Sequence, residues 1–371
     1  MRFPLASLLA LALAGSVSAK PPIQARVEST ASSAVSSDGD GLAFKILQLA
    51  DLHLTGIPGL QCNDPPRDMA PGACNESLTA VFIAELLDVE KPDFVVFSGD
   101  NVNIYSRRAR QRAVDAVTDE VEARGIPYAM VFGNHDESGD FPREEIMQFF
   151  NQKPHSYAER GPTSVDGVGN YLLNVSAPAD GVWGAKGDDV LRMYFLDSGA
   201  EADTTQYPYV FSEYDWIKPS QIKYYRELSA AGRARSGGHV LPALMFFHIP
   251  LIEYSFVTSS RCHGEKHEGV SSQGMNLRLL STLASVGEVK AVFVGHDHLN
   301  EYCCLVDGVQ LCYGGGTGFG RAYGSPDFIR RARVIEWTID GQGHRKIRSW
   351  KRFYGDINAV HSEEVLYSEG S

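Results

Sequence analysis

The chain has 371 residues, of which 43% are hydrophobic and 22% charged, and its formal net charge is −12. This composition is typical of a globular protein of one large or two ordinary domains, and it excludes a disordered or fibrous chain. The acidic balance argues against nucleic acid as the main partner, because binding that polyanion depends on Lys and Arg neutralising phosphates.

Two segments at the N-terminus are predicted to lie outside the folded domain. Residues 1–19 combine one positive charge, a short apolar run and small residues up to Ala19, which is the pattern of a secretory signal peptide. Residues 20–41 are rich in Ser, Ala, Asp and Gly and predict a flexible linker. The apolar run is too short to cross a bilayer, so no integral membrane segment is expected. We therefore predict a secreted protein, located outside the cell, in the secretory pathway or in a vacuole.

The domain itself is expected to span residues 42–354 and to begin with a β-strand. Six short runs rich in β-branched and aromatic residues each break into Gly, Asp, Asn or His at their C-terminal end, which predicts strands that deliver polar groups to one edge of a sheet. The runs are residues 44–53, 93–101, 128–136, 191–199, 243–250 and 291–298.

Helices are predicted between some of these strands. Residues 77–90 have apolar side chains at helical spacing, with Ser77 as the expected N-cap, and residues 108–124 form a second helix. Residues 137–189 are expected to be rich in loops, and residues 355–371 to form a polar tail. Alternation of strands and helices indicates an α/β fold with its functional site at the carboxyl edge of a sheet.

The six cysteines are expected to form disulfides, because their number is even and the chain is predicted to be secreted. Two of them bracket a Pro-rich polar loop. Two others flank a candidate two-residue hairpin turn, Asp307-Gly308, and counting outward from that turn places them opposite each other. The expected pairs are Cys62 with Cys74, Cys303 with Cys312 and, from the two that remain, Cys262 with Cys304. Free buried thiols stay open as an alternative.

Asn75 and Asn174 each begin an Asn-X-Ser sequence, which is the acceptor pattern for N-glycosylation in a secreted chain.

The strand ends together carry a set of metal-binding side chains. Imidazoles, carboxylates and an amide oxygen are ligands that suit Zn, Mn or Fe. A single such residue at a strand end usually has a structural explanation, but five fragments in succession indicate a metal site. The residues are Asp51, His53, Asp100, Asn134, His135, His248, His296 and His298.

The ordered motifs DLH, GDN, GNHD, FFHIP and GHDH resemble those of the calcineurin-like metallophosphoesterase superfamily, from about residue 46 to residue 324. Residues 261–274, 312–324 and 330–334 are similar to the fungal and plant group labelled purple acid phosphatase 28/29-like. The resemblance implies a four-layer α/β (α+β) fold, with a central β-sandwich flanked by helices and a two-metal site at one edge.

The resemblance also implies a role for each site residue. Asp51, His53 and His298 would hold one metal ion, Asn134, His248 and His296 the other, and Asp100 would bridge the two. His135 would assist the leaving group, and Asp136 would orient His135. Two such ions, of Fe, Zn or Mn, activate water for attack on a small phosphate ester.

One position departs from the purple acid phosphatases. Their colour comes from a tyrosine three residues after the bridging aspartate, where this chain has Asn103, and they lack the histidine that stands here at His53. Tyr105 could take the place of that tyrosine only if the motif were aligned in a different register. The ligand set therefore predicts a colourless enzyme of the general metallophosphoesterase kind.

The sequence thus predicts a secreted phosphoesterase, with an inactive binding or regulatory protein of the same fold as the alternative. The sequence argues against a zinc protease, because it contains no HExxH motif. The glycine-rich residues 314–320 lack the ending of a P-loop and predict a tight turn that passes close to the metal site. The basic residues 107–112 predict a solvated helix face.

Overall fold

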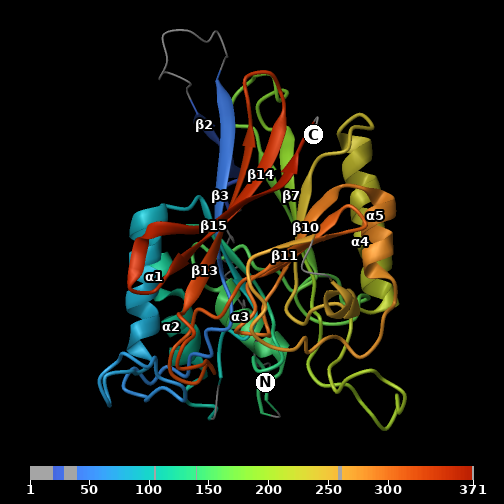
Figure 1. The fold of residues 1–371 in the computed structure, drawn as a ribbon. Coiled ribbons are helices and arrows are strands. Elements are labelled where there is room, and N and C mark those ends of the chain that lie inside the picture. Colours follow the sequence, from blue (N-terminus) through green and yellow to red (C-terminus); the bar gives the residue numbers. More distant parts are fainter. Residues whose placement is uncertain (1–19, 29–39, 104–105, 139, 258–260, 370–371) are drawn as a thin grey trace, which may run out of the picture.

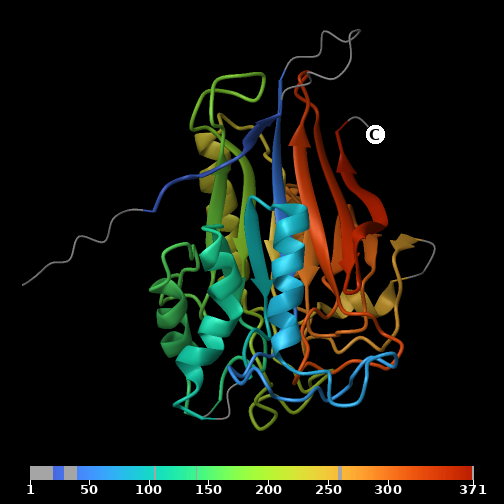
Figure 2. The same ribbon diagram turned by 90° about the vertical axis from the view of Figure 1, so that its left-hand side faces the viewer.

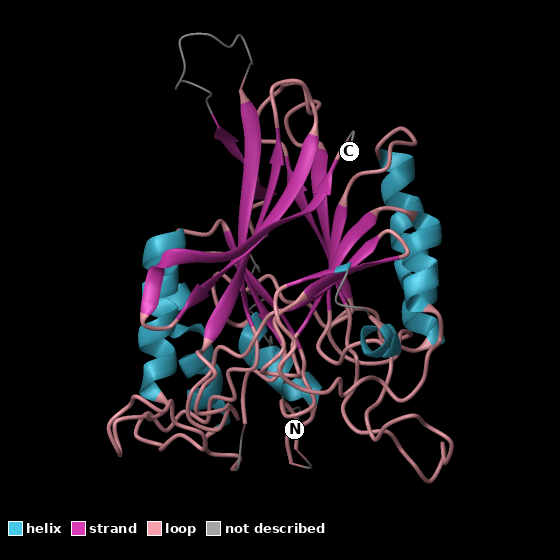
Figure 3. Cartoon of the chain, viewed as in Figure 1, coloured by secondary structure: helices cyan, strands magenta, loops and turns pink. Residues whose placement is uncertain are grey.

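Two β-sheets lie face to face in the computed structural model, with helices on both outer sides (Figures 1 and 3). The structure describes residues 20–28, 40–103, 106–138, 140–257 and 261–369. The helix–sheet–sheet–helix arrangement confirms the predicted four-layer sandwich.

The first sheet holds three of the metal-binding strand ends and is covered by the first three helices (Figure 2). Its strand order is β15-β14-β13-β3-β4-β5, and β2 pairs with β3. The strands are β2 (Arg26–Glu28), β3 (Gly41–Leu49), β4 (Phe94–Ser98), β5 (Tyr128–Val131), β13 (Arg331–Ile339), β14 (Arg345–Phe353) and β15 (Asp356–Ser368). The helices are α1 (Ser77–Glu90), α2 (Arg110–Ala123) and α3 (Arg143–Asn151).

The second sheet holds the other strand ends and is covered by α4 (Pro219–Arg235) and α5 (Leu279–Val286). Its strand order is β1-β6-β7-β8-β10-β12-β11-β9. The strands are β1 (Ile23–Gln24), β6 (Tyr171–Ser176), β7 (Asp189–Phe195), β8 (Ala243–Phe246), β9 (Cys262–His263), β10 (Val289–Val294), β11 (Cys303–Val306) and β12 (Val309–Tyr313). A 3₁₀-helix, η1, covers Ile252–Phe256.

Alternating side chains of the central strands fill two separate cores. Along β8, Leu244 and Phe246 join the large core between the sheets, whereas Ala243 and Met245 join the core beneath α4 and α5. Both faces of the strand are buried, so the sequence there is a continuous apolar run rather than an alternating one.

The carboxyl ends of the parallel strands meet at one end of the sandwich. β3, β4 and β5 run parallel to one another, as do β7, β8, β10 and β12. The segments that follow β3, β4, β5, β8 and β10 are those that carry the metal-binding motifs. Figures 1 and 3 show long connecting loops gathered at this end.

Both segments expected to be unstructured contribute strands. Within residues 20–41, Ile23 and Ala25 are buried, β1 pairs with β6 and β2 pairs with β3, so the expected linker joins both sheets. The expected polar tail forms β15 at the edge of the first sheet. Strand pairing uses backbone groups, and an edge strand with one face in solvent tolerates polar side chains. The predicted signal peptide, residues 1–19, lies outside the described residues.

Two further expectations were wrong in detail. Helix α1 begins at Ser77, but its N-cap is Glu76, and the backbone N–H of Ser77 donates to Asn75 Oδ1 at 3.1 Å. Residues 137–189 contain α3 and β6, which the Gly- and Pro-rich loops around them obscure in the sequence.

The three predicted disulfides are confirmed: Cys62–Cys74, Cys262–Cys304 and Cys303–Cys312. Cys303 lies opposite Cys312 across the β11–β12 hairpin, as counting from Asp307-Gly308 predicts. None of the described helices is long and apolar enough to cross a membrane.

Candidate metal centre

Buried carboxylates and imidazoles converge where the two sheets meet. One group comprises Asp51, His53, Asp100 and His298, and another comprises Asp100, His248 and His296. Asp100 belongs to both: its Oδ2 lies 3.3 Å from His53 Nε2 and 3.3 Å from His248 Nε2. Apart from Asn134, which neither group includes, this division follows the two ligand sets that the sequence motifs imply, and Asp100 is common to both groups.

Several polar atoms of this cluster are buried without a hydrogen-bond partner among the described residues. A buried polar atom left unpaired costs about 1–3 kcal/mol, so five of them in one place need an explanation. The atoms are Asp51 Oδ2, His53 Nδ1, Asn134 Oδ1, His248 Nε2 and His296 Nε2. Oxygen and imidazole donors of this kind fit Zn, Mn or Fe ions. Cations would satisfy four of these atoms, but not His53 Nδ1, since the His53 ring turns its Nε2 toward Asp100.

The backbone holds two imidazoles in a fixed orientation. His248 Nδ1 lies 3.0 Å from the carbonyl oxygen of Ser98, and His298 Nδ1 lies 2.8 Å from that of Tyr323. Each ring therefore donates through Nδ1 and presents Nε2 to the cluster. This is the usual way in which a protein sets the orientation of a metal-binding histidine.

Four residues of the cluster have a left-handed backbone conformation. The φ angles are 57° at Asp51, 47° at His53, 50° at Asp100 and 78° at His296. For residues other than glycine this conformation costs about 1 kcal/mol or more each, and it concentrates at functional sites. The sharp turn after each strand directs the side chain into the cluster instead of continuing the sheet.

Glycines allow the chain to pass close to these side chains. A Cβ on Gly99 would lie 2.3 Å from His248 Nδ1, and one on Gly318 would lie 2.3 Å from the carbonyl oxygen of Leu52. The backbone N–H of Gly318 also donates to the carbonyl of Asp51 at 3.3 Å. The glycine-rich residues 314–320 therefore form the close backbone passage that their sequence predicts.

In the absence of cations, burial and neighbouring charges shift the pKa values of the cluster in opposite directions. Burial raises the pKa of Asp51 to about 8, opposed by His248 and reinforced by Asp100. Burial, reinforced by His248, lowers the pKa of His296 to about 3. Burial also disfavours a charged His248, but the adjacent Asp100 carboxylate outweighs it and raises the pKa of His248 to about 9. Without metal ions, the cluster thus keeps a proton where a ligand should be deprotonated.

The GNHD motif lies against Asp100, but one of its residues has a different role from the one expected. The backbone N–H of His135 donates to Asp100 Oδ1 at 2.8 Å, and its imidazole is exposed, 5.1 Å from that of His53 between ring centres. The carboxylate of Asp136 accepts hydrogen bonds from the backbone N–H groups of Gly133 and Val102 at 2.7 and 2.8 Å. Asp136 therefore fixes the backbone of the motif, and no hydrogen bond joins it to the His135 ring among the described residues.

Tyr323 is a residue of the site that sequence reasoning did not single out. Its ring stacks on His298 at 3.6 Å, and its hydroxyl accepts the backbone N–H of His298 at 2.9 Å. The same hydroxyl donates to Glu268 at 3.0 Å. The available signal for Tyr323 in the sequence was its position just after the glycine-rich residues 314–320.

Of the two residues predicted to be glycosylated, Asn75 lies in the position that better suits attachment of a glycan. It lies half-buried in the loop before α1, whereas Asn174 lies within β6 with its Oδ1 buried. Acceptor sequences are typically found in surface loops. Attachment at either residue stays a prediction.

Comparison with known proteins agrees with this geometry. The chain is 35% identical over 350 residues to a protein of Arabidopsis thaliana named "Probable inactive purple acid phosphatase 29", covering 88% of this chain and 87% of that protein. It is 33% identical to Phosphatase DCR2 of Saccharomyces cerevisiae, covering 85% of this chain and 55% of that protein. A dimetal phosphatase from Danio rerio shares the fold with a TM-score of 0.52 at 15% identity, covering 87% of this chain and 98% of that structure. Since residues 44–300 also match the family model of the calcineurin-like phosphoesterases, the chain belongs to that family.

Proposed function

We propose that this protein hydrolyses phosphate esters at a dinuclear metal centre formed by Asp51, His53, Asp100, Asn134, His248, His296 and His298. The observation that carries the proposal is the buried cluster of unpartnered ligand atoms, divided into two groups that share Asp100. An exposed imidazole, His135, stands beside it.

The side chains supply distinct parts of the reaction. When bound, two cations would acidify water and neutralise charge on the phosphoryl oxygens. Asp100 would serve both ligand groups, since its Oδ2 lies 3.3 Å from an imidazole of each group. His135 is exposed and therefore accessible to substrate, where it would donate a proton to the leaving oxygen. Asp136 would hold His135 in place through the backbone of the motif.

The ligand set favours Zn, Mn or Fe, and we propose that the loaded protein is colourless. The position that would supply the coloring tyrosine of purple acid phosphatases is Asn103. Tyr105 lies outside the described residues. An absorption spectrum of the iron-loaded protein tests this directly, since a visible charge-transfer band would contradict it.

We further propose that the protein is secreted. All six cysteines are paired in disulfides, which is compatible with an oxidising compartment. Expression with the native N-terminus, followed by N-terminal sequencing of the exported product, tests cleavage after Ala19.

The decisive experiment compares two variants with the natural protein. Chelated protein is reloaded with Zn, Mn or Fe and assayed on p-nitrophenyl phosphate and bis-p-nitrophenyl phosphate. We expect Asp100→Asn to lose both metal content and turnover, because it removes the shared ligand. His135→Ala should keep its metal content and lose turnover by roughly 10²- to 10⁴-fold, as expected for loss of a proton donor.

The outcome separates the proposal from its alternative. Full metal loading without turnover of either ester would show a metal-binding protein of this fold that is not a hydrolase. That is the reading favoured by the name of the Arabidopsis relative, "Probable inactive purple acid phosphatase 29". Within the ligand motifs themselves, every position of this chain carries a competent residue.

A further inference from the structure

A pocket of about 570 Å³ lies next to the candidate metal centre. It is formed by the loop residues 211–214, by η1 and by residues 270–272. Tyr214 links it to the centre, because the Tyr214 ring packs edge-on against His296 at 4.4 Å between ring centres. One wall of the pocket is thus in contact with a candidate metal ligand.

The walls of the pocket are held together by hydrogen bonds between the two loops. The backbone N–H of Phe211 donates to the carbonyl of Gly274 at 2.8 Å, and that of Gly274 donates to Tyr214 at 2.9 Å. The hydroxyl of Ser212 donates to the carbonyl of Ser272 at 2.5 Å. The pocket is therefore formed before any ligand enters, which lowers the entropic cost of binding.

The lining combines apolar side chains with the hydroxyl groups of Ser212, Ser255, Ser271 and Ser272, and it suits an uncharged group. Phe211, Ile252, Phe256 and Val270 supply apolar surface, and the Phe256 side chain is 75% exposed. Glu213 is the charged residue among the described lining residues, which include no Lys, Arg or His. Exposed aromatic surface gains free energy when an apolar ligand covers it, whereas a second anionic group would lie beside the Glu213 carboxylate with no cationic side chain among the described lining residues.

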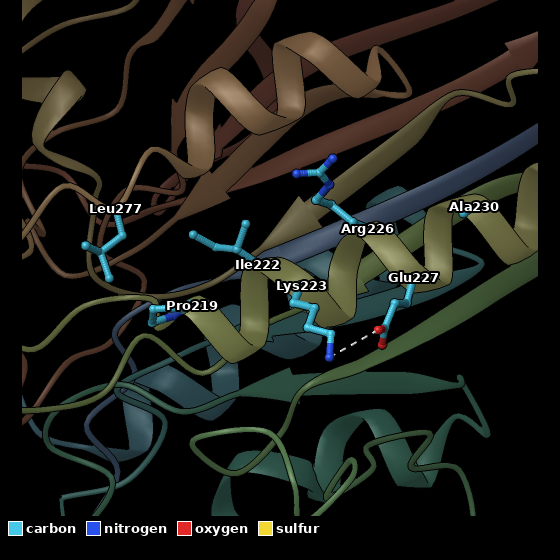
Figure 4. A pocket seen from close by; sticks show the side chains of 7 residues that line it. All are labelled: Pro219, Ile222, Lys223, Arg226, Glu227, Ala230 and Leu277. Carbon is cyan, nitrogen blue, oxygen red and sulfur yellow. Dashed lines mark ion pairs between the residues drawn. The ribbon is translucent and has the colours of Figure 1, made fainter.

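A second apolar groove provides a contrast. It runs along α4, where Pro219, Ile222 and Leu277 lie beside the Lys223–Glu227 ion pair (Figure 4). No candidate metal ligand lines it. It offers apolar surface without contact to the site, so it serves as a control.

We propose that the pocket beside Tyr214 binds the organic group of the phosphate ester, and that this group is an uncharged aromatic or branched aliphatic one. The inference rests on the proposed function, since it assigns the substrate class of the same site. It disfavours substrates whose organic group carries further phosphates.

The test measures binding rather than turnover. Phenylphosphonate and methylphosphonate are titrated calorimetrically into the metal-loaded protein, because neither is hydrolysed. We expect phenylphosphonate to bind about tenfold more tightly, as burial of an aromatic ring allows. Phe256→Ala should reduce this preference to about twofold or less and leave the affinity for methylphosphonate unchanged. Ile222→Ala, in the groove on α4, should change neither affinity.

Three outcomes of the binding test would overturn the inference. Equal affinity for the two phosphonates, a preference that survives Phe256→Ala, or no binding of either compound to the fully loaded protein would each do so. A clear preference in a protein that turns over no ester would uphold the pocket and reject the proposed hydrolase function. Turnover of an ester without a preference for phenylphosphonate would uphold the proposed hydrolase function and reject the pocket.

Discussion

At the scale of single residues, Asp51 shows how the fold prepares a site for cations. Its carboxyl group is fully buried, with Oδ1 accepting the backbone N–H of His296 at 2.8 Å and Oδ2 lacking a partner among the described residues. Burial raises its pKa to about 8. A cation would reverse this shift, since metal binding requires the ionised carboxylate.

Metal binding should therefore release protons near neutral pH. At pH 7, below its pKa of about 8, Asp51 is protonated in the metal-free protein and must lose that proton when an ion binds. Metal affinity should rise as the pH increases toward 9, because His248, with a pKa of about 9, must also lose a proton. The part of the proton release that comes from Asp51 should disappear above pH 8. Titration of Zn²⁺ by calorimetry in buffers of different ionisation enthalpy measures the number released.

The control for this release is Asp51→Asn, which cannot titrate at this position. It should release fewer protons per bound ion than the natural protein. Equal proton release by the two proteins at pH 7 would show that Asp51 is already ionised in the metal-free state.

At the scale of elements, the turn after β3 and the glycine-rich segment position each other. The backbone N–H groups of Thr317 and Gly318 donate to the carbonyls of Ala50 and Asp51. The segment thus supports the turn that carries Asp51 and His53 from a region more than 260 positions away in the sequence.

Gly318→Ala should consequently impair the metal centre. Its Cβ would lie 2.3 Å from the backbone oxygen of Leu52, so the two segments must separate. We expect a loss of about 2 kcal/mol or more in the free energy of unfolding and weaker metal binding, measured by urea denaturation and metal titration. Gly59→Ala is the matched control, because its Cβ meets no atom within 4 Å. An equal effect of the two variants would contradict the close approach.

At the scale of the whole molecule, strands distant in sequence complete both sheets. β1 and β2, near the N-terminus, join different sheets, and β15 extends the first sheet beyond β14. β15 also packs against the core, where Leu366 is 6% exposed, while its neighbour Val365 is 50% exposed. The C-terminal strand is therefore part of the folded domain.

This pair of neighbours gives a direct test of that packing. Leu366→Ala should lower the free energy of unfolding by about 2–3 kcal/mol, because it leaves a cavity between β15 and the core. Val365→Ala, on the solvent face of the same strand, should change it by about 0.5 kcal/mol or less. Thermal or urea unfolding of both variants measures the difference. If residues 355–371 were a loose tail, neither substitution would matter.

The sequence by itself determined the elements whose signals are local. An apolar run that ends in Asp51, Asp100 or His296 indicates both a strand and its candidate metal-binding end, because both patterns lie within ten residues. The Asp307-Gly308 turn likewise sets the register that pairs Cys303 with Cys312.

The tertiary structure alone decided what depends on contacts between distant segments. Edge strands such as β15 pair through the backbone, so their polar side chains carry no periodic signal. Asp136 was assigned to the His135 ring from the motif, but its carboxylate accepts hydrogen bonds from the backbone of Gly133 and from Asn101 and Val102, which the fold brings near it. Tyr214 follows no strand and belongs to no motif, and it reaches His296 because the loop before α4 folds back over the carboxyl end of the second sheet. Local physics thus specified the candidate ligands of the site, whereas packing between distant segments specified the geometry that brings them together and the pocket beside them.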